Sequence, residues 1–312
     1  MIHPIPSGTR DVLPDEMREL RAITEALRGV FDARGYGEVY TPALEYASEL
    51  EPAGAPPAYR LFDEHGEPMV LRTDMTVPIA RVVATRYADA EPPLRFAYFA
   101  HAYRAVRPQR GQPREFLQAG IELVGSPAPD GTVEALRVLC ESLSAVGLRD
   151  FRVGLGDASL YPALLDGHEV APDARARILH ELATRDFVGL ERELTAAGLP
   201  AEILTIPQTR GPDLPDEGGP LGEALKGMRA VRDGLPSEVA ERVIFDLGLS
   251  RGLGYYTGAI FEVYDPALGA PIGGGGRYDD LLGRFGRALP AVGFAFNVER
   301  VHLALTGEEE RS

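Results

Sequence analysis

Residues 114–124 read Arg-Glu-Phe-Leu-Gln-Ala-Gly-Ile-Glu-Leu-Val, and this stretch predicts a strand with two chemically different faces. Alternate side chains of a strand share a face. One face is apolar and is predicted to be core: Leu117, Ala119, Ile121 and Leu123. The other face carries Gln118, Gly120 and Glu122, which can bind a polar ligand, with Gly120 leaving space between the two side chains. Taken alone, the segment favours the alternative, a polar face that is covered by water.

This strand is one arm of a predicted hairpin, whose other arm spans 94–104. A basic, turn-rich loop at 106–113 joins the two arms. Further extended segments are expected at 36–44 (interrupted by Pro42), 69–72, 243–247, 259–264 and 291–296. Helices are expected at 15–34, 76–87, 132–146 and from 298 onward. A hairpin mixed with helices, without regular βαβ alternation, indicates an α+β fold with a mainly antiparallel sheet flanked by helices.

Residues from about 158 to 240 have a different character. They predict short helices at 172–184, 189–197 and 221–234, with a break rich in Pro, Gly and Asp at 207–220. We expect one core domain over 1–312, interrupted by this small helical insertion.

Composition limits the class of protein. The chain has 312 residues, of which 45% are hydrophobic and 25% charged, as in a globular protein. It has no apolar run long enough to cross a membrane and no signal-peptide core. Cys140 is the single cysteine and lies on the apolar face of a predicted helix, so we expect a buried thiol and no disulfide. These features predict a cytoplasmic protein without membrane contact.

The charge balance argues against a nucleic-acid partner. With 47 acidic and 32 basic residues, the net charge is −15. Nucleic-acid binders usually present a basic face to the phosphates. The chain is therefore not expected to bind tRNA.

Three further segments can carry chemistry. Asp74 and Thr76 either cap the helix that follows them or present a carboxylate and a hydroxyl to an ammonium group. Arg251 lies in a glycine-rich stretch before Tyr255 and Tyr256, and its planar fork suits a carboxylate or a phosphate. Aromatic packing in a glycine-rich turn is the equal alternative. Residues 273–279, Gly-Gly-Gly-Gly-Arg-Tyr-Asp, lack the ending of a P-loop, and a strand closely approached by other backbone fits them at least as well.

No cofactor or metal site is expected. The histidines lack metal-ligand spacing: His3, His65, His101, His168, His180 and His302.

Taken together and in order, these segments resemble the histidyl-tRNA synthetase family, which has a class II aminoacyl-tRNA synthetase core. The resemblance covers nearly the whole chain. Its markers are residues 6–11 (Pro-Ser-Gly-Thr-Arg-Asp), Tyr40-Thr41-Pro42 of motif 1, residues 103–122 of motif 2, 251–258 and 275–279 of the histidine-specific segments, and 293–300 of motif 3.

The resemblance implies a histidine-shaped pocket and self-association through the motif 1 region. Carried over residue by residue, the histidine-binding set is Asp74, Thr76, Arg104, Gln118, Glu122, Arg251, Tyr255 and Tyr256. A free amino acid needs carboxylates or hydroxyls for its ammonium group, arginine for its carboxylate and a hydrogen-bond partner for its ring.

Departures from the family pattern argue against aminoacylation. Val106 replaces the motif 2 glutamate that helps to hold adenine. Motif 3 normally has glycine ahead of its Glu-Arg for ATP to approach, and here Asn297 lies close by, although Arg300 remains. The chain also ends at Ser312, where the synthetases continue into an anticodon-binding domain.

The branch of the family without that domain is the regulatory subunit of ATP phosphoribosyltransferase. Resemblance to this branch implies a noncatalytic partner of the short-form catalytic subunit in the first step of histidine biosynthesis, with feedback inhibition by histidine. The alternatives are a short enzyme that activates histidine or another amino acid with ATP, and a free-standing amino-acid-binding protein.

Overall fold

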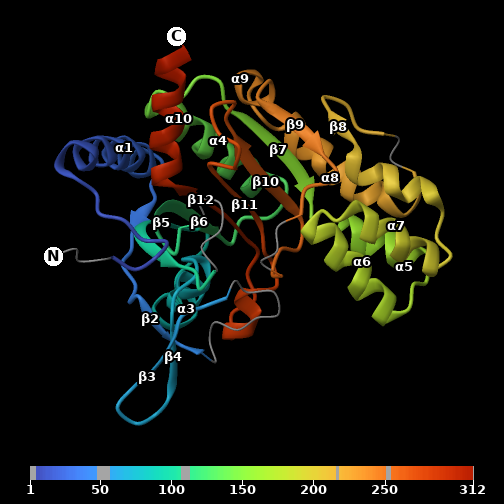
Figure 1. The fold of residues 1–312 in the computed structure, drawn as a ribbon, viewed down its shortest axis with the longest axis horizontal. Helices are drawn as coiled ribbons and strands as arrows, with labels where there is room; N and C mark the ends of the chain where they lie inside the picture. Colours follow the sequence, from blue (N-terminus) through green and yellow to red (C-terminus); the bar gives the residue numbers. More distant parts are fainter. Residues whose placement is uncertain (1–4, 48–56, 107–112, 216–217, 251–253, 312) are drawn as a thin grey trace.

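The computed structural model describes residues 5–47, 57–106, 113–215, 218–250 and 254–311 (Figure 1). A large sheet runs through this part of the chain, with the strand order β1-β5-β6-β12-β11-β10-β7-β9-β8. The pairs β1–β5 and β7–β9 are parallel and the remaining pairs are antiparallel. The strands are β1 Gly37–Glu38, β5 Leu94–Tyr103, β6 Glu115–Val124, β7 Arg152–Asp157, β8 Arg210–Gly211, β9 Val243–Asp246, β10 Ala259–Tyr264, β11 Gly273–Arg277 and β12 Ala291–Asn297. The predicted α+β fold with a mainly antiparallel sheet is confirmed.

A second, three-stranded sheet has the order β2-β4-β3 and projects below the large one in Figure 1. Its strands are β2 Leu44–Tyr46, β3 Arg60–Phe62 and β4 Pro68–Leu71. The extended segment predicted at 36–44, with an interruption at Pro42, consists of two short edge strands: β1 and β2 belong to different sheets, and Pro42 lies between them. Proline has no N–H for a strand ladder, which favours a break at this position.

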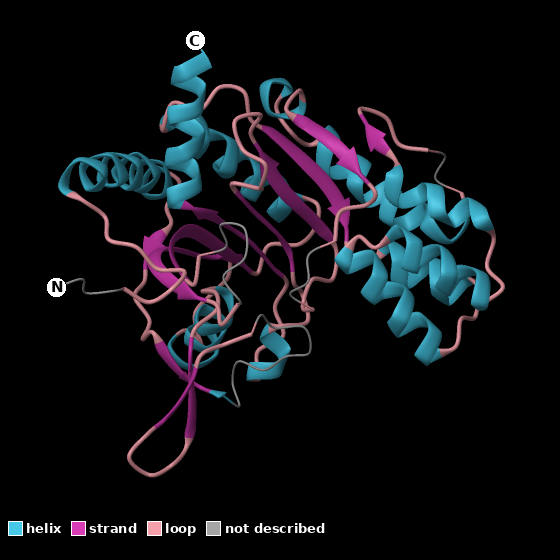
Figure 2. Ribbon diagram, in the orientation of Figure 1, coloured by secondary structure: helices cyan, strands magenta, loops and turns pink. Residues whose placement is uncertain are grey.

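Helices cover the large sheet (Figure 2). Their bounds are α1 Pro14–Ala33, α3 Thr76–Arg86, α4 Asp130–Ala145, α5 Leu160–Gly167, α6 Pro172–Thr184, α7 Phe187–Ala196, α8 Gly222–Asp233, α9 Ser237–Ala240 and α10 Val298–Arg311, with short 3-10 turns at Ala201–Gln208, Gly219–Leu221 and Leu282–Phe285. Helix α1 starts at a proline, where the missing N–H costs nothing. It packs against α4 and α10 and buries Leu20, Ile23, Leu27 and Phe31. The helices predicted from the sequence are present within one or two residues of their expected ends.

Helices α5, α6 and α7 lie beyond the β9–β8 edge of the sheet, whereas α8 packs against β7 and α4 (Figure 1). Helices α6, α7 and α8 were predicted, whereas α5, the turn at Ala201–Gln208 and strand β7 were not. Each missed element contributes to the main core through buried side chains such as Leu164, Ile203 and Leu155. That residues from about 158 to 240 form a separate insertion stays a prediction.

Among the described residues, no helix combines the length and the apolar character that crossing a bilayer requires.

Cys140 lies on the buried face of α4, as predicted, with 3% of its surface exposed. Burial raises the pKa of its thiol to about 12, so the nucleophilic thiolate is scarce at neutral pH. We expect a disulfide reagent such as DTNB to leave the native protein unmodified and to release one equivalent of thionitrobenzoate after denaturation in urea. Stoichiometric reaction of the native protein within minutes would contradict this burial.

Candidate functional site

The polar face of β6 is buried, not covered by water. Glu122 has 1% of its surface exposed and Gln118 has 8%. Strand β6 lies between β5 and β12, which place Phe96 and Gly293 on either side of Glu122. Helix α3 and the chain after β11 cover this face through Thr76 and Tyr278. The water-covered alternative is therefore wrong.

Gly120 does not leave room for a ligand. A Cβ at this position would lie 2.2 Å from the carbonyl oxygen of Phe294 and 2.5 Å from the hydroxyl of Tyr98. The Tyr98 ring, itself buried, occupies the space that the sequence had assigned to a ligand. Here glycine permits close packing of strands and an aromatic ring.

Glu122 is held by two hydroxyl groups. Thr76 Oγ1 donates to Glu122 Oε1 over 2.7 Å, and the Tyr278 hydroxyl donates to Oε2. Thr76 is also hydrogen-bonded to Tyr255. The rings of Tyr255 and Tyr278 meet edge to face with 5.8 Å between centroids, and those of Tyr255 and Tyr256 lie 4.9 Å apart. Together with Asp74, these residues form what we call the inner cluster: Asp74, Thr76, Glu122, Tyr255, Tyr256 and Tyr278.

Burial in the inner cluster disfavours the ionised forms of its two carboxyl groups, Asp74 and Glu122. Burial raises the pKa of Glu122 to about 8, although the two hydroxyls act against this rise. Burial also raises the pKa of Asp74, against the stabilising effects of the Val77 N–H and of Arg104. Desolvation penalises the ionised form of a carboxyl group that has no adjacent cation. Among the described residues, Arg104 acts on Asp74 and no cation acts on Glu122, so an incoming cationic group would favour the ionised forms of both carboxyl groups.

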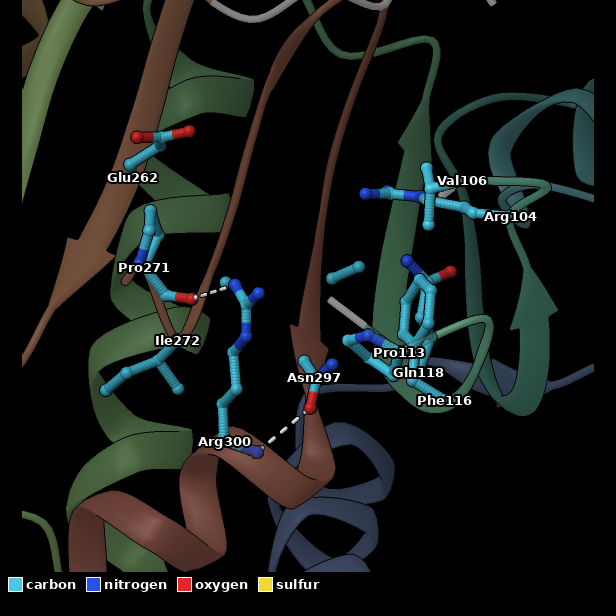
Figure 3. A pocket seen from close by; sticks show the side chains of 12 residues that line it. Arg104, Val106, Pro113, Phe116, Gln118, Glu262, Pro271, Ile272, Asn297 and Arg300 are labelled. Atoms are coloured by element: carbon cyan, nitrogen blue, oxygen red, sulfur yellow. Dashed lines mark hydrogen bonds between the residues drawn. The ribbon is translucent and has the colours of Figure 1, made fainter. Parts of the chain in front are cut away.

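A pocket of about 350 Å³ is linked to the inner cluster through Arg104, which lines the pocket and acts electrostatically on Asp74 (Figure 3). Arg104, Phe116 and Gln118 line the side formed by β5 and β6, while Arg300 rises from α10 toward Pro271 on the opposite side. The Arg300 guanidinium donates to the Pro271 carbonyl over 2.8 Å. Among the residues that the structure describes, the buried oxygen of the Gln118 amide has no hydrogen-bond partner, which marks it as an acceptor available to a ligand.

Two residues that depart from the family pattern lie at this pocket. Val106 contributes an apolar side chain to its lining. Asn297 accepts the N–H of Arg300 on its side-chain oxygen over 2.9 Å, which is the geometry of a helix N-cap for α10. Asn297 thus has a structural role that glycine cannot perform.

The sequence of this chain is similar to those of known proteins. The family described as Histidyl-tRNA synthetase matches residues 8–301. The ATP phosphoribosyltransferase regulatory subunit of Symbiobacterium thermophilum is 41% identical, with 96% of this chain and 79% of the relative covered. That of Desulforamulus reducens is 39% identical over 96% and 78% of the two chains. The chain belongs to the ATP phosphoribosyltransferase regulatory subunit family.

Solved structures agree with this membership. A protein of Bacillus halodurans C described as an ATP phosphoribosyltransferase regulatory subunit/histidyl-tRNA synthetase matches with a TM-score of 0.86 and 31% identity, covering 97% of this chain and 84% of that one. The histidine–tRNA ligase subunit of Alicyclobacillus acidocaldarius matches with a TM-score of 0.82 and 32% identity over 99% of each chain. Histidyl-tRNA synthetase of Nostoc sp. PCC 7120, at 22% identity and a TM-score of 0.80, supports the fold alone over 99% of this chain and 76% of its own. The class II synthetase-like fold is confirmed.

In this member of the regulatory-subunit family, most of the predicted site residues lie close together. Asp74, Thr76, Glu122, Tyr255 and Tyr256 lie in the inner cluster. Arg104 and Gln118 line the adjoining pocket, and Arg104 acts electrostatically on Asp74. Arg251 lies outside the described residues. Their role in binding histidine stays a prediction.

Two residues that shape the site, Tyr278 and Arg72, were not among the predicted site residues. Tyr278 lies in a segment that the sequence had marked, at 273–279, but its contact with Glu122 was not foreseen. Arg72 is 3% exposed and donates to the carbonyls of Thr41 and His101 over 2.7 and 2.8 Å. An arginine directly before Thr73 and Asp74 was the available signal.

The buried carboxyl group of Glu122 predicts a pH-dependent stability. Its pKa of about 8 lies above the ordinary 4.5, so its contribution is complete below pH 4.5 and is lost as pH rises through 8. We expect the free energy of unfolding to fall over this range, and Glu122→Gln to flatten the fall and to raise the melting temperature near pH 8. Denaturant titrations at several pH values measure this. A wild-type stability that rises from about pH 5 to about pH 8 would contradict the assignment.

Proposed function

We propose that this chain is a noncatalytic regulatory subunit that a short-form ATP phosphoribosyltransferase catalytic subunit needs for the first step of histidine biosynthesis, in the cytoplasm. The similarity to curated regulatory subunits at 39–41% identity over 96% of the chain carries this proposal. Chemistry belongs to the partner, and this chain senses histidine. The net charge of −15 supports a function without tRNA.

Histidine is the ligand that we propose for the inner cluster and its pocket. The carboxylate of Asp74 and the hydroxyl of Thr76 would bind the ammonium group, and Arg104 and Arg251 the ligand's carboxylate. Glu122 and the tyrosine hydroxyls would bind the imidazole ring, and Gln118 offers an amide oxygen that has no partner within the described part of the chain. Two buried carboxyl groups with raised pKa values favour a ligand that brings positive charge.

The alternative function is activation of histidine with ATP. Arg104 and Arg300, on opposite sides of a pocket of about 350 Å³, support it because both can bind phosphates. Val106 opposes it, since valine cannot hydrogen-bond adenine. An ATP–pyrophosphate exchange assay with histidine separates the two functions. Robust exchange by this chain alone would favour the enzyme, and exchange at the background level favours the regulatory subunit.

Self-association through the motif 1 region is part of the proposal. Apolar side chains are exposed on and beside the three-stranded sheet: Tyr40, Leu44, Tyr46, Leu61 and Phe62. Tyr40 and Phe62 expose 84% and 71% of their surface, and exposed apolar patches commonly mark interfaces. Light scattering of the wild type and of Tyr40→Ser tests this. A dimer that the substitution weakens is expected, whereas a monomeric wild type would contradict it.

The decisive experiment for the regulatory function is co-expression with a short-form catalytic subunit from the same kind of genome. We expect the two chains to copurify and the phosphoribosyltransferase activity per catalytic subunit to exceed that of the catalytic subunit alone. If the chains neither copurify nor raise activity, the assignment fails.

A further inference from the structure

We propose that Arg114 is a positioning residue for the binding of the ligand's carboxylate, because it clamps a turn near the N-terminus to the segment that carries Arg104. This N-terminal turn comprises residues 6–9, Pro-Ser-Gly-Thr. The inference deepens the proposed function and rests on it. It gives the N-terminal turn a role in ligand binding that requires no contact between the turn and the ligand.

The position of Arg104 matters because this residue connects the pocket to the inner cluster. Its guanidinium lies over the Phe116 ring, 5.1 Å from the centroid, and acts electrostatically on Asp74. In the proposed binding mode Asp74 binds the ammonium group and Arg104 the carboxylate, and a single carbon atom joins these two groups of the ligand. Arg104 must therefore lie at a defined distance from Asp74, since binding groups need placement to about 0.5 Å.

The segment that carries Arg104, residues 104–106, lies just beyond the end of β5. The N–H of Arg104 donates to the carbonyl of Arg114 over 2.9 Å, and the N–H of Ala105 donates to the carbonyl of Pro57 over 2.8 Å. At the other end, Nε of Arg114 donates to the carbonyl of Val106 over 3.1 Å. Arg114 therefore holds both ends of this segment, one through its backbone and the other through its guanidinium.

The same guanidinium binds the N-terminal turn. Nη1 of Arg114 donates to the carbonyl of Ser7 over 2.9 Å, and the N–H of Arg114 donates to the carbonyl of Gly8 over 2.8 Å. Gly8 has a φ of 82°, in the left-handed region that favours glycine. A Cβ at Gly8 would lie 3.0 Å from Cγ of Arg114, so the turn and the arginine side chain are closely packed.

The N-terminal turn is itself fixed to the body of the protein. Thr9 closes it, because its N–H and its hydroxyl donate to the carbonyl of Pro6 over 3.1 and 2.7 Å. The next residue, Arg10, forms an ion pair of 2.6 Å with Glu16 in the first turn of α1 and interacts electrostatically with Glu299 of α10. The turn is thus anchored at two helices, and Arg114 connects residues 104–106 to this fixed point.

Titration calorimetry with histidine and with histamine, which lacks the carboxylate, tests the inference. We expect Arg114→Met to bind histidine at least about tenfold more weakly than the wild type does, and histamine within about twofold of the wild-type affinity. Histamine has no group for Arg104, so a displaced Arg104 does not affect it. Unchanged histidine binding, or equal weakening of both ligands, would overturn the inference and leave the histidine site intact. A wild type that binds no histidine would instead contradict the proposed function.

Gly8→Ala disturbs the same clamp from the opposite side. Alanine is strained at this φ, and its Cβ would press against the side chain of Arg114. We expect the same selective loss of histidine binding, and this variant takes the place of Arg114→Met if the latter does not fold. If histamine binds the wild type too weakly to measure, crystal structures of the wild type and the variant decide. A displaced backbone at residues 104–106 is expected, and an unmoved one would overturn the inference.

Arg242 provides the matched control. Its guanidinium also donates to two backbone carbonyls, those of Arg149 and Phe151, over 2.7 and 3.3 Å, and it is not among the residues that line the pocket. Arg242→Met should bind both ligands as the wild type does. A selective loss of histidine binding in this control would show that the loss in Arg114→Met does not report on Arg104, and would overturn the inference.

Discussion

Replacing Gly293 by alanine is expected to destabilise the protein by about 3 kcal/mol, because the new methyl group has no space. Its Cβ would lie 1.7 Å from Oε2 of Glu122 and 2.5 Å from the carbonyl oxygen of Ile121. Glu122 is fixed between Thr76 and Tyr278, and Ile121 belongs to the ladder between β6 and β12. Neither neighbour can withdraw without breaking those hydrogen bonds. Urea unfolding measures the change in the free energy of unfolding.

Gly29 provides the matched control. It lies inside α1, where an added Cβ would meet nothing within 4 Å. Gly29→Ala should therefore stabilise the protein by about 0.5–1 kcal/mol, since alanine loses less conformational entropy in a helix. If Gly293→Ala unfolds at the same urea concentration as the wild type, the packing of Glu122 against β12 is incorrect.

The substitution Arg72→Met is expected to destabilise the protein by about 3 kcal/mol, because it removes the arginine donor from the buried carbonyl of Thr41 and from two part-buried carbonyls. Arg72 donates to Thr41, Pro42 and His101, and so connects the segment between β1 and β2 to β5. Methionine keeps most of the volume, so the loss reports on hydrogen bonds. Because Arg72 precedes Thr73 and Asp74, we also expect weaker histidine binding. Urea unfolding and calorimetry measure the two effects.

Arg86 is the control for this substitution. It is an exposed arginine in the last turn of α3, and Arg86→Met should change stability by no more than about 0.5 kcal/mol. Equal effects of the two substitutions would show that Arg72 does not cross-link the segments as described.

The sequence predicted the fold well where a local pattern repeats. The alternation of Leu117, Ala119, Ile121 and Leu123 identified the core face of β6, and the 3.6-residue period identified α1. Prediction from the sequence failed where the pairing of a strand depends on partners that are distant along the chain. Nothing local in residues 36–44 shows that β1 pairs with β5 while β2 joins another sheet, and β7 is defined by its pairing with β9 and β10.

The site was predictable in its residue types and less so in its environment. Glu122 and Gln118 stood out as polar residues on one strand face, but a polar face gives no sign of whether water or protein covers it. The covering groups, Tyr98 and Tyr278, come from β5 and from the chain after β11. For the same reason Gly120 was interpreted as space for a ligand, because the sequence does not show that the Tyr98 ring fills it. Burial, and with it the raised pKa of Glu122, arises only in the folded chain.

The most direct test of the account is histidine inhibition of the complex reconstituted from this chain and a short-form ATP phosphoribosyltransferase catalytic subunit. Two complexes are prepared, one with the wild-type chain and one with Asp74→Asn. The activity of each complex with histidine is compared with its own activity without histidine. We predict that histidine inhibits the wild-type complex, and that the variant complex requires at least about tenfold more histidine for the same fractional inhibition. Equal inhibition of both complexes would place the feedback site away from the inner cluster, and an uninhibited wild-type complex would contradict the account as a whole.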